Sequence, residues 1–167
     1  EYLLSEDKRS KVKGIIITHG HEDHTGAINH IVDKIQAPIY ATALTRGLLE
    51  VKLNKRNNLG LADLRTVNAG DSAKIGVFDV EFCHVSHSIP DAVALGINTP
   101  EGLIVHTGDY KFDHTPVDNW PTDYAKLSEW SSRGVLALMA DSTNADKPGW
   151  TASERSIDAA FDKVFSE

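Results

Sequence analysis

The feature that most constrains this chain is a dense group of polar residues directly after a short apolar run. Residues 14–18 read Gly-Ile-Ile-Ile-Thr, which predicts a buried β-strand. The next six residues, His19-Gly-His21-Glu-Asp23-His24, hold three histidines and two acids. Imidazole nitrogens and carboxylate oxygens are usual zinc ligands, and a glycine permits the tight turn that brings such side chains together. We therefore predict that this loop supplies ligands to two metal ions, with Glu22 as a bystander.

Two further ligand candidates follow predicted strands later in the chain. His87 comes after the strand expected over residues 77–85, and Asp109 follows the apolar run 103–105 and the residues His106-Thr107-Gly108. Layered α/β domains tend to present functional side chains where strands end. Each signal is weak alone, and the first loop strengthens both. The remaining histidines are interpreted as structural: His84, which is a rival ligand inside the strand, and His30, His106 and His114.

The rest of the pattern predicts a mixed α/β layered domain with its strands on the inside. A helix is expected to begin with Thr25 as N-cap, to repeat apolar residues through Ile35 and to end before Pro38. We expect further strands over 39–41, 65–67, 72–75, 92–98, 103–107 and 135–140, and helices over 44–55, 123–132 and 154–165. Residues 1–167 are expected to form part of a single domain.

Composition narrows the class of protein. The chain has 167 residues, of which 41% are hydrophobic and 25% charged, and no apolar run approaches the ~20 residues of a membrane helix. The one cysteine, Cys83, excludes an intrachain disulfide, which favours a reducing, cytoplasmic location. The net charge of −7 argues against a strong nucleic-acid surface on this chain. Bound cations would offset that charge locally around the ligand loop.

The motifs together resemble a known family. The loop His19 to His24 resembles the signature of the metallo-β-lactamase superfamily of metal-dependent hydrolases. Three later segments are similar to the ribonuclease J family: His87-Ser-Ile-Pro-Asp91, His106-Thr-Gly-Asp109-Tyr-Lys-Phe-Asp113 and Asp141-Ser-Thr-Asn144. The resemblance implies an αββα sandwich and a ribonuclease that cleaves RNA phosphodiesters.

The resemblance also implies a ligand set for two zinc ions. His19, His21 and His87 would hold one ion, Asp23 and His24 the other, and Asp109 would bridge them. In the mechanism that this implies, a hydroxide between the ions attacks phosphorus, and Asp23 orients or deprotonates it.

The chain departs from the family in one respect. Ribonuclease J proteins carry a further zinc-binding histidine late in the chain, after an inserted β-CASP domain, whereas no histidine follows His114 here. We therefore expect an internal fragment that lacks the first strands and the β-CASP insertion, with RNA bound mainly by a domain outside this chain. Activity of the isolated chain, self-association of the full-length protein, and exonuclease versus endonuclease action stay open.

Two other functions compete with this reading. A small-molecule metallohydrolase of the glyoxalase II or lactamase type shares the first motif, but Ser-Ile-Pro-Asp replaces the glycine-rich run expected after His87. An inactive interaction domain would have lost ligands, whereas all six candidates are present. Asp141 is expected either near the metals or as a turn cap, and Lys111 and Arg155 are expected on the solvated surface.

Overall fold

The computed structural model describes residues 2–166 and contains two β-sheets. The first is parallel, in the order β1 (Ile15–Ile17), β2 (Ile39–Ala41), β3 (Leu64–Thr66). The second follows chain order: β4 (Ser72–Ile75), β5 (Phe78–His84), β6 (Val93–Thr99), β7 (Gly102–His106) and β8 (Val135–Met139). Its neighbouring strands are antiparallel except β7 and β8, which run parallel.

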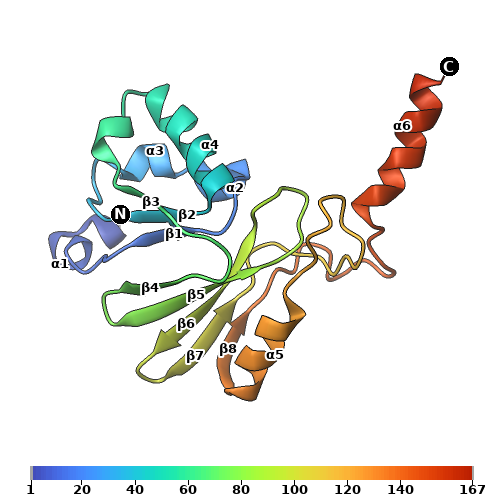
Figure 1. Cartoon of the computed structure of the whole chain (residues 1–167). Helices are drawn as coiled ribbons and strands as arrows, with labels where there is room; N and C mark the ends of the chain where they lie inside the picture. Colours follow the sequence, from blue (N-terminus) through green and yellow to red (C-terminus); the bar gives the residue numbers. More distant parts are fainter. Residues whose placement is uncertain (1, 167) are drawn as a thin grey trace.

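The chain also contains α-helices, which lie outside the two-sheet body (Figure 1). They are α1 (Glu6–Arg9), α2 (Glu22–Thr25), α3 (Ile28–Ile31), α4 (Ala43–Asn54), α5 (Tyr124–Ser132) and α6 (Asp158–Phe165), with 3₁₀ turns η1 (Tyr2–Leu4), η2 (Leu59–Leu61) and η3 (Glu154–Ile157). Figure 1 shows α2, α3 and α4 over the first sheet and α5 beside the second. The order of layers is helix, sheet, sheet, helix, which is the αββα arrangement expected from the resemblance.

Three apolar clusters fill the spaces between these layers. The first, between the helices and the first sheet, contains Ile17, Ile28, Val32, Ile39, Ala41, Leu49 and Leu53. The second, between the sheets, contains Tyr40, Val67, Ile75, Val80, Phe82, Val93 and Leu95. The third, under α5, contains Cys83, Val85, Ala92, Ala94, Leu103, Val105 and Trp130. Alternation along β5 serves two clusters at once, because Phe82 faces the first sheet while Cys83 faces α5.

The helix after the ligand loop differs from the prediction. The expected single helix from Thr25 is two short helices, and the first, α2, begins inside the motif with His21 as its N-cap. Thr25 is therefore the last residue of α2, and its hydroxyl donates to the His21 carbonyl at 2.9 Å. The predicted apolar contacts persist, since Ile28 and Ile35 are buried.

The strand 135–140 forms as β8, but its side chains are not on the inside. All five residues of β8 are exposed, with Leu136 at 60% and Leu138 at 64%. Its only pairing among residues 2–166 is with β7, so β8 is an edge strand. The other predicted strands form within about two residues of the expected positions.

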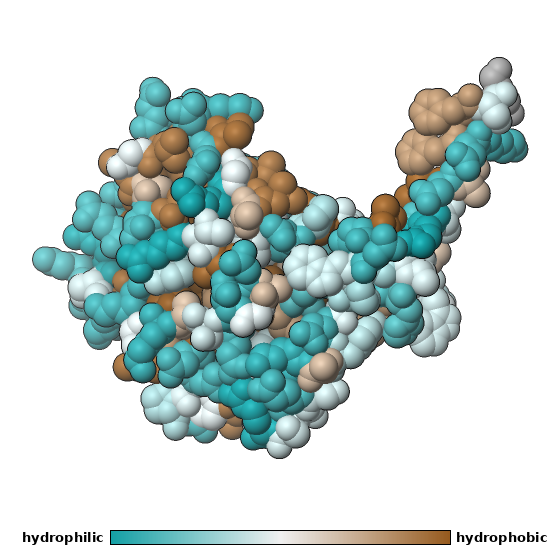
Figure 2. Space-filling model, in the orientation of Figure 1, coloured by the Kyte–Doolittle hydropathy of each residue, from teal (hydrophilic) through white to brown (hydrophobic). Residues whose placement is uncertain are grey.

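The helix predicted over 154–165 is split into η3 and α6, and α6 projects from the body (Figure 1). Figure 2 shows apolar side chains along this projection, and Phe161, Val164 and Phe165 are exposed. No helix within residues 2–166 has both the length and the apolar character required to cross a membrane.

Candidate metal centre

The end of β1 buries the first candidate ligand. His19 follows Thr18 directly and has no exposed surface. The Thr18 hydroxyl lies 3.1 Å from His19 Nδ1, in hydrogen-bonding position, which restrains the ring and leaves Nε2 as its other nitrogen. His19 Nε2 is itself buried and has no hydrogen-bond partner among the described residues. A buried polar atom without a partner is costly, so this nitrogen is oriented for a ligand that it can bind.

Two distant strand ends bring the later candidates to the same place. His87 follows β5 and its Nε2 lies 3.1 Å from His21 Nδ1. Asp109 follows β7, and its Oδ2 lies 3.9 Å from both His19 Nε2 and His87 Nε2. Its other oxygen, Oδ1, lies 3.3 Å from His24 Nε2. The carboxylate therefore faces a different histidine group with each oxygen.

The side chains form two potential ligand groups. One contains His19, His21 and His87, and the other contains His19, His24 and Asp109, with the ligand atoms of each group within 4.8 Å of one another. Five of the six candidate ligands therefore converge. The sixth, Asp23, belongs to neither group: its side chain is 76% exposed and its Oδ2 lies 3.6 Å from His24 Nε2.

The donor set and its electrostatics suit a divalent metal. Burial, together with the neighbouring His24 and His87, lowers the pKa of His19 to about 4, while Asp109 acts in the opposite direction. Partial burial and His21 lower the pKa of His87 in the same way. These imidazoles are neutral near pH 7, which is the form that binds metals. The residues present thus fit the group that the motif implies.

Gly108 explains how Asp109 approaches the first loop. Its φ of 58° lies in the left-handed region that favours glycine. A Cβ placed on it would lie 3.0 Å from the Val93 carbonyl oxygen and 3.1 Å from Thr18 Cβ. Only glycine lets the turn after β7 close against the end of β1, which brings the Asp109 carboxylate beside His19.

The other histidines lie outside these groups. His84 stacks on Trp120 with ring centroids 3.8 Å apart, and its Nε2 is 2.9 Å from the Trp120 carbonyl oxygen. His106 Nδ1 accepts a hydrogen bond from Gly108 N–H, His114 stacks on Tyr124, and His30 is exposed. None of them is in a potential ligand group within residues 2–166.

Asp141 serves as a turn cap and also lies near the centre. Its Oδ1 accepts hydrogen bonds from the Thr143 amide and hydroxyl, which lower the Asp141 pKa. Its charge acts on His87 by raising the His87 pKa against the effect of burial. Both expected roles are therefore partly met, although Asp141 is in neither ligand group.

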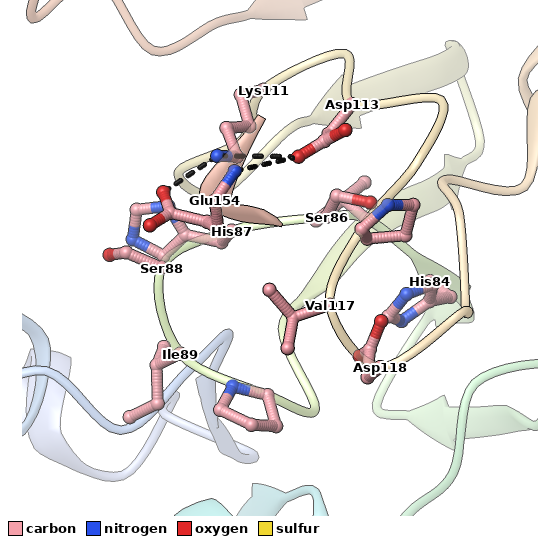
Figure 3. Close-up of a pocket in the computed structure, with 13 residues that line it drawn as sticks. His84, Ser86, His87, Ser88, Ile89, Lys111, Asp113, Val117, Asp118 and Glu154 are labelled. Atoms are coloured by element: carbon pink, nitrogen blue, oxygen red, sulfur yellow. Dashed lines mark hydrogen bonds and ion pairs between the residues drawn. The ribbon is translucent and has the colours of Figure 1, made fainter. Parts of the chain in front are cut away.

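Lys111 is not on the solvated surface, contrary to the prediction. Its side chain is 14% exposed, and its Nζ lies 2.6 Å from Glu154 Oε1 and 3.5 Å from Asp113 Oδ2. These residues and the His87 loop line the same cavity of about 310 Å³ (Figure 3). Arg155 is exposed, as predicted, and donates to the Pro116 carbonyl and to Asn119 Oδ1.

Sequence reasoning missed Thr18 and Gly108 as parts of the site. Thr18 orients His19, and Gly108 permits the close approach of Asp109. The sequence contains one indication of these roles, because each residue directly precedes a ligand candidate. Their roles depend on contacts between β1 and the turn after β7, which no local pattern specifies.

Known proteins share these features. The sequence model of the metallo-beta-lactamase superfamily matches residues 2–162. Over 163 residues the chain is 45% identical to "Ribonuclease J" of Helicobacter pylori, covering 95% of this chain and 23% of that protein. It is 43% identical to "Ribonuclease J" of a Synechocystis species, covering 96% of this chain and 26% of that protein. The chain therefore spans about a quarter of the length of these relatives.

A solved structure agrees on the fold. A protein of unknown function from Enterococcus faecalis V583 superposes with a TM-score of 0.61 at 21% identity, covering 86% of this chain and 34% of that one. The family model, the layered architecture and the converging ligand loops agree with one another on the family. The chain belongs to the metallo-β-lactamase superfamily.

Proposed function

We propose that this chain carries the divalent-metal centre of a ribonuclease that hydrolyses RNA phosphodiesters. The observation that carries the proposal is the convergence of four histidines and Asp109 from three separate loops. The similarity to ribonuclease J proteins over about 95% of the chain supports RNA as the substrate class. We also propose that the chain forms part of a single metallo-β-lactamase domain and that the protein is located in the cytoplasm.

The proposed ligand assignment follows the two groups. His19, His21 and His87 would hold one ion, His24 and Asp23 the other, and the two oxygens of Asp109 support a bridging role. The exposed Asp23 side chain is next to His24 and is free to turn toward it. We propose zinc for both ions because the set is rich in imidazole nitrogen.

The chain's own residues would divide the work of hydrolysis. Two divalent ions held here would supply charge stabilisation for an in-line displacement at phosphorus and a water of lowered pKa. Because the pKa values of His19 and His87 are lowered, both imidazoles are neutral at pH 7 and would have nitrogen lone pairs available to bind cations. Asp23 would orient the attacking water and accept its proton on a carboxylate oxygen.

The ligand assignment is tested by metal content. Asp109→Ala and Asp23→Ala are compared with His30→Ala, which changes an exposed histidine outside the site. We expect two ions per chain in the parent and in His30→Ala, and fewer in both aspartate variants, by atomic emission. Unchanged metal content in both aspartate variants would refute the assignment.

The substrate class is tested in a chimera. The chain replaces the matching segment of the Helicobacter pylori relative, and 5′-monophosphorylated RNA and a thioester are offered separately. We expect the chimera to cleave RNA, and Asp109→Ala and Asp23→Ala to abolish cleavage while His30→Ala retains it. Thioester hydrolysis without RNA cleavage would instead favour a small-molecule metallohydrolase.

A further inference from the structure

The segment from His87 to Asp91 is attached to a helix that carries none of the candidate metal ligands. Asp91 Oδ2 accepts a hydrogen bond from the Leu44 amide at 3.1 Å, in the first turn of α4. The Asp91 carbonyl accepts a second one, from the Thr42 hydroxyl, at 2.9 Å. Asp91 and Leu44 are 47 residues apart in sequence, so these bonds join two separate parts of the fold.

The N-terminus of α4 depends on this external carboxylate. Thr42 occupies the N-cap position, yet its side chain makes no capping hydrogen bond to the helix. Its hydroxyl instead donates to the Asp91 carbonyl at 2.9 Å, and the same oxygen lies 3.1 Å from the Thr45 hydroxyl on α4. The first amides of a helix need acceptors, and a carboxylate is favoured there by the helix dipole. Asp91 supplies that acceptor from the loop that carries His87.

The backbone of Asp91 is adapted to this contact. Its φ of 67° is in the left-handed region, where asparagine and aspartate are tolerated better than most residues. The turn directs the carboxylate toward α4 and returns the chain to β6, which begins two residues later.

A second contact ties α4 to the other ligand loop. A Cβ placed on Gly20 would lie 2.5 Å from Leu48 Cδ1 and 3.2 Å from Ile89 Cδ1. Gly20, which separates His19 from His21, is therefore packed between α4 and the His87 loop. Figure 3 shows His87, Ser88 and Ile89 along one side of the cavity, with Ile89 at the far end of the loop from Lys111.

We propose that Asp91 is a positioning residue, which sets His87 against His21 by clamping the 87–91 loop to the N-terminus of α4. The 3.1 Å separation of His87 Nε2 and His21 Nδ1 is the geometry that this clamp maintains. The proposal rests on the proposed metal centre for its functional meaning, whereas the clamp itself can be measured without metal.

The test compares Asp91→Ala with a matched helix cap elsewhere. Asp123 caps α5 by accepting from the Lys126 amide at 2.9 Å, so Asp123→Ala removes a similar bond away from the centre. We expect Asp91→Ala to weaken zinc binding by 10-fold or more, measured by competition with a chromophoric chelator. Asp123→Ala should lower thermal stability but leave zinc affinity within about twofold, since outer ligand partners tune affinity and remote caps do not.

A conservative variant separates geometry from charge. Asp91→Asn keeps an oxygen acceptor and tolerates the positive φ, so we expect it to restore most of the zinc affinity and the parent absorption spectrum with cobalt. If Asp91→Ala fails to fold, Thr42→Val removes the other half of the clamp and is expected to weaken zinc binding in the same direction. The proposal would be overturned if the parent, Asp91→Ala and Asp123→Ala bound zinc with equal affinity. If Asp91→Ala does not fold, equal zinc affinity in the parent and Thr42→Val would overturn it.

Amide hydrogen exchange in the presence of a chelator distinguishes failure of the clamp from failure of the metal centre. Residues 86–91 should exchange faster in Asp91→Ala than in the parent and in Asp123→Ala. If Asp91→Ala does not fold, Thr42→Val is compared with the parent and Asp123→Ala instead. A parent chain that binds no zinc would refute the proposed function, and this exchange result would then decide the clamp alone. Unchanged exchange in this loop refutes the clamp whatever the zinc result.

Discussion

At the scale of single residues, His19 is the residue that links the two potential ligand groups. It belongs to both ligand groups, it is fully buried, and Thr18 fixes its ring. An imidazole in this position is stable only when neutral, because its charged form would be buried beside other histidines. The residue is therefore adapted to binding a cation and poorly adapted to holding a proton.

This burial predicts a pH dependence of stability in chelator. The pKa of His19 falls from 6.5 in the unfolded chain to about 4 in the fold, so the unfolded state binds more protons between these values. A tenfold change in proton affinity corresponds to about 1.4 kcal/mol, so His19 should contribute up to ~3 kcal/mol. That contribution is complete above pH 6.5 and is lost as the pH falls toward 4.

The measurement is urea unfolding at a series of pH values. His19→Gln should show a shallower loss of unfolding free energy between pH 6.5 and 4 than the parent, while His30→Gln should follow the parent because His30 is exposed. Identical pH dependence in His19→Gln and the parent would show that burial of His19 does not govern acid stability.

At the scale of elements, the packing of α5 on the second sheet depends on one glycine. A Cβ on Gly96 in β6 would lie 2.4 Å from the Trp130 ring, which is fully buried. A rigid indole cannot move aside as a flexible side chain can. The flat surface of β6 at Gly96 is thus what allows Trp130 to fill the third cluster.

Two glycine substitutions test this packing against helix propensity. Gly96→Ala should lower the free energy of unfolding by about 1–3 kcal/mol through overpacking. Gly47→Ala in α4, where nothing lies within 4 Å of the new Cβ, should raise it by about 0.5–1 kcal/mol. Both values are read from denaturant midpoints, and a Gly96→Ala variant as stable as the parent would contradict the contact.

At the scale of the whole molecule, charge limits what the chain can bind alone. The net charge is −7, and Lys111, one of its cations near the centre, is already paired with Glu154 and Asp113. Phosphate backbones are held mainly by unpaired Lys and Arg. The relatives are about four times longer, so most of their surface lies outside the segment matched here.

We therefore predict that the chain by itself binds RNA weakly. A filter-binding assay at physiological salt should give a dissociation constant above about 1 μM, in the range typical of non-specific contacts. The chimera with the Helicobacter pylori relative should bind more tightly and with a steeper salt dependence. Tight, salt-dependent binding by the chain alone would contradict the prediction.

The sequence by itself identified the candidate ligands and predicted most of the local structure. The strand before His19, the spacing of the loop and the strand ends at His87 and Asp109 are local patterns, and they predicted the strands and five converging ligand candidates. The resemblance supplied the αββα arrangement, which the layers confirm. Periodicity could not show that the helix after the loop begins within the motif, because capping and helix breaks depend on a few local hydrogen bonds.

Tertiary structure alone decided which of these residues meet and what supports them. Contacts between distant segments pair Lys111 with Glu154 and join Asp91 to α4. The fold also leaves Asp23 outside both ligand groups and β8 exposed. Side-chain packing and hydrogen bonds across more than 40 residues carry no periodic signal in the chain. The candidate ligands could therefore be identified from the sequence, whereas the contacts between Asp91 and α4 became visible only in the fold.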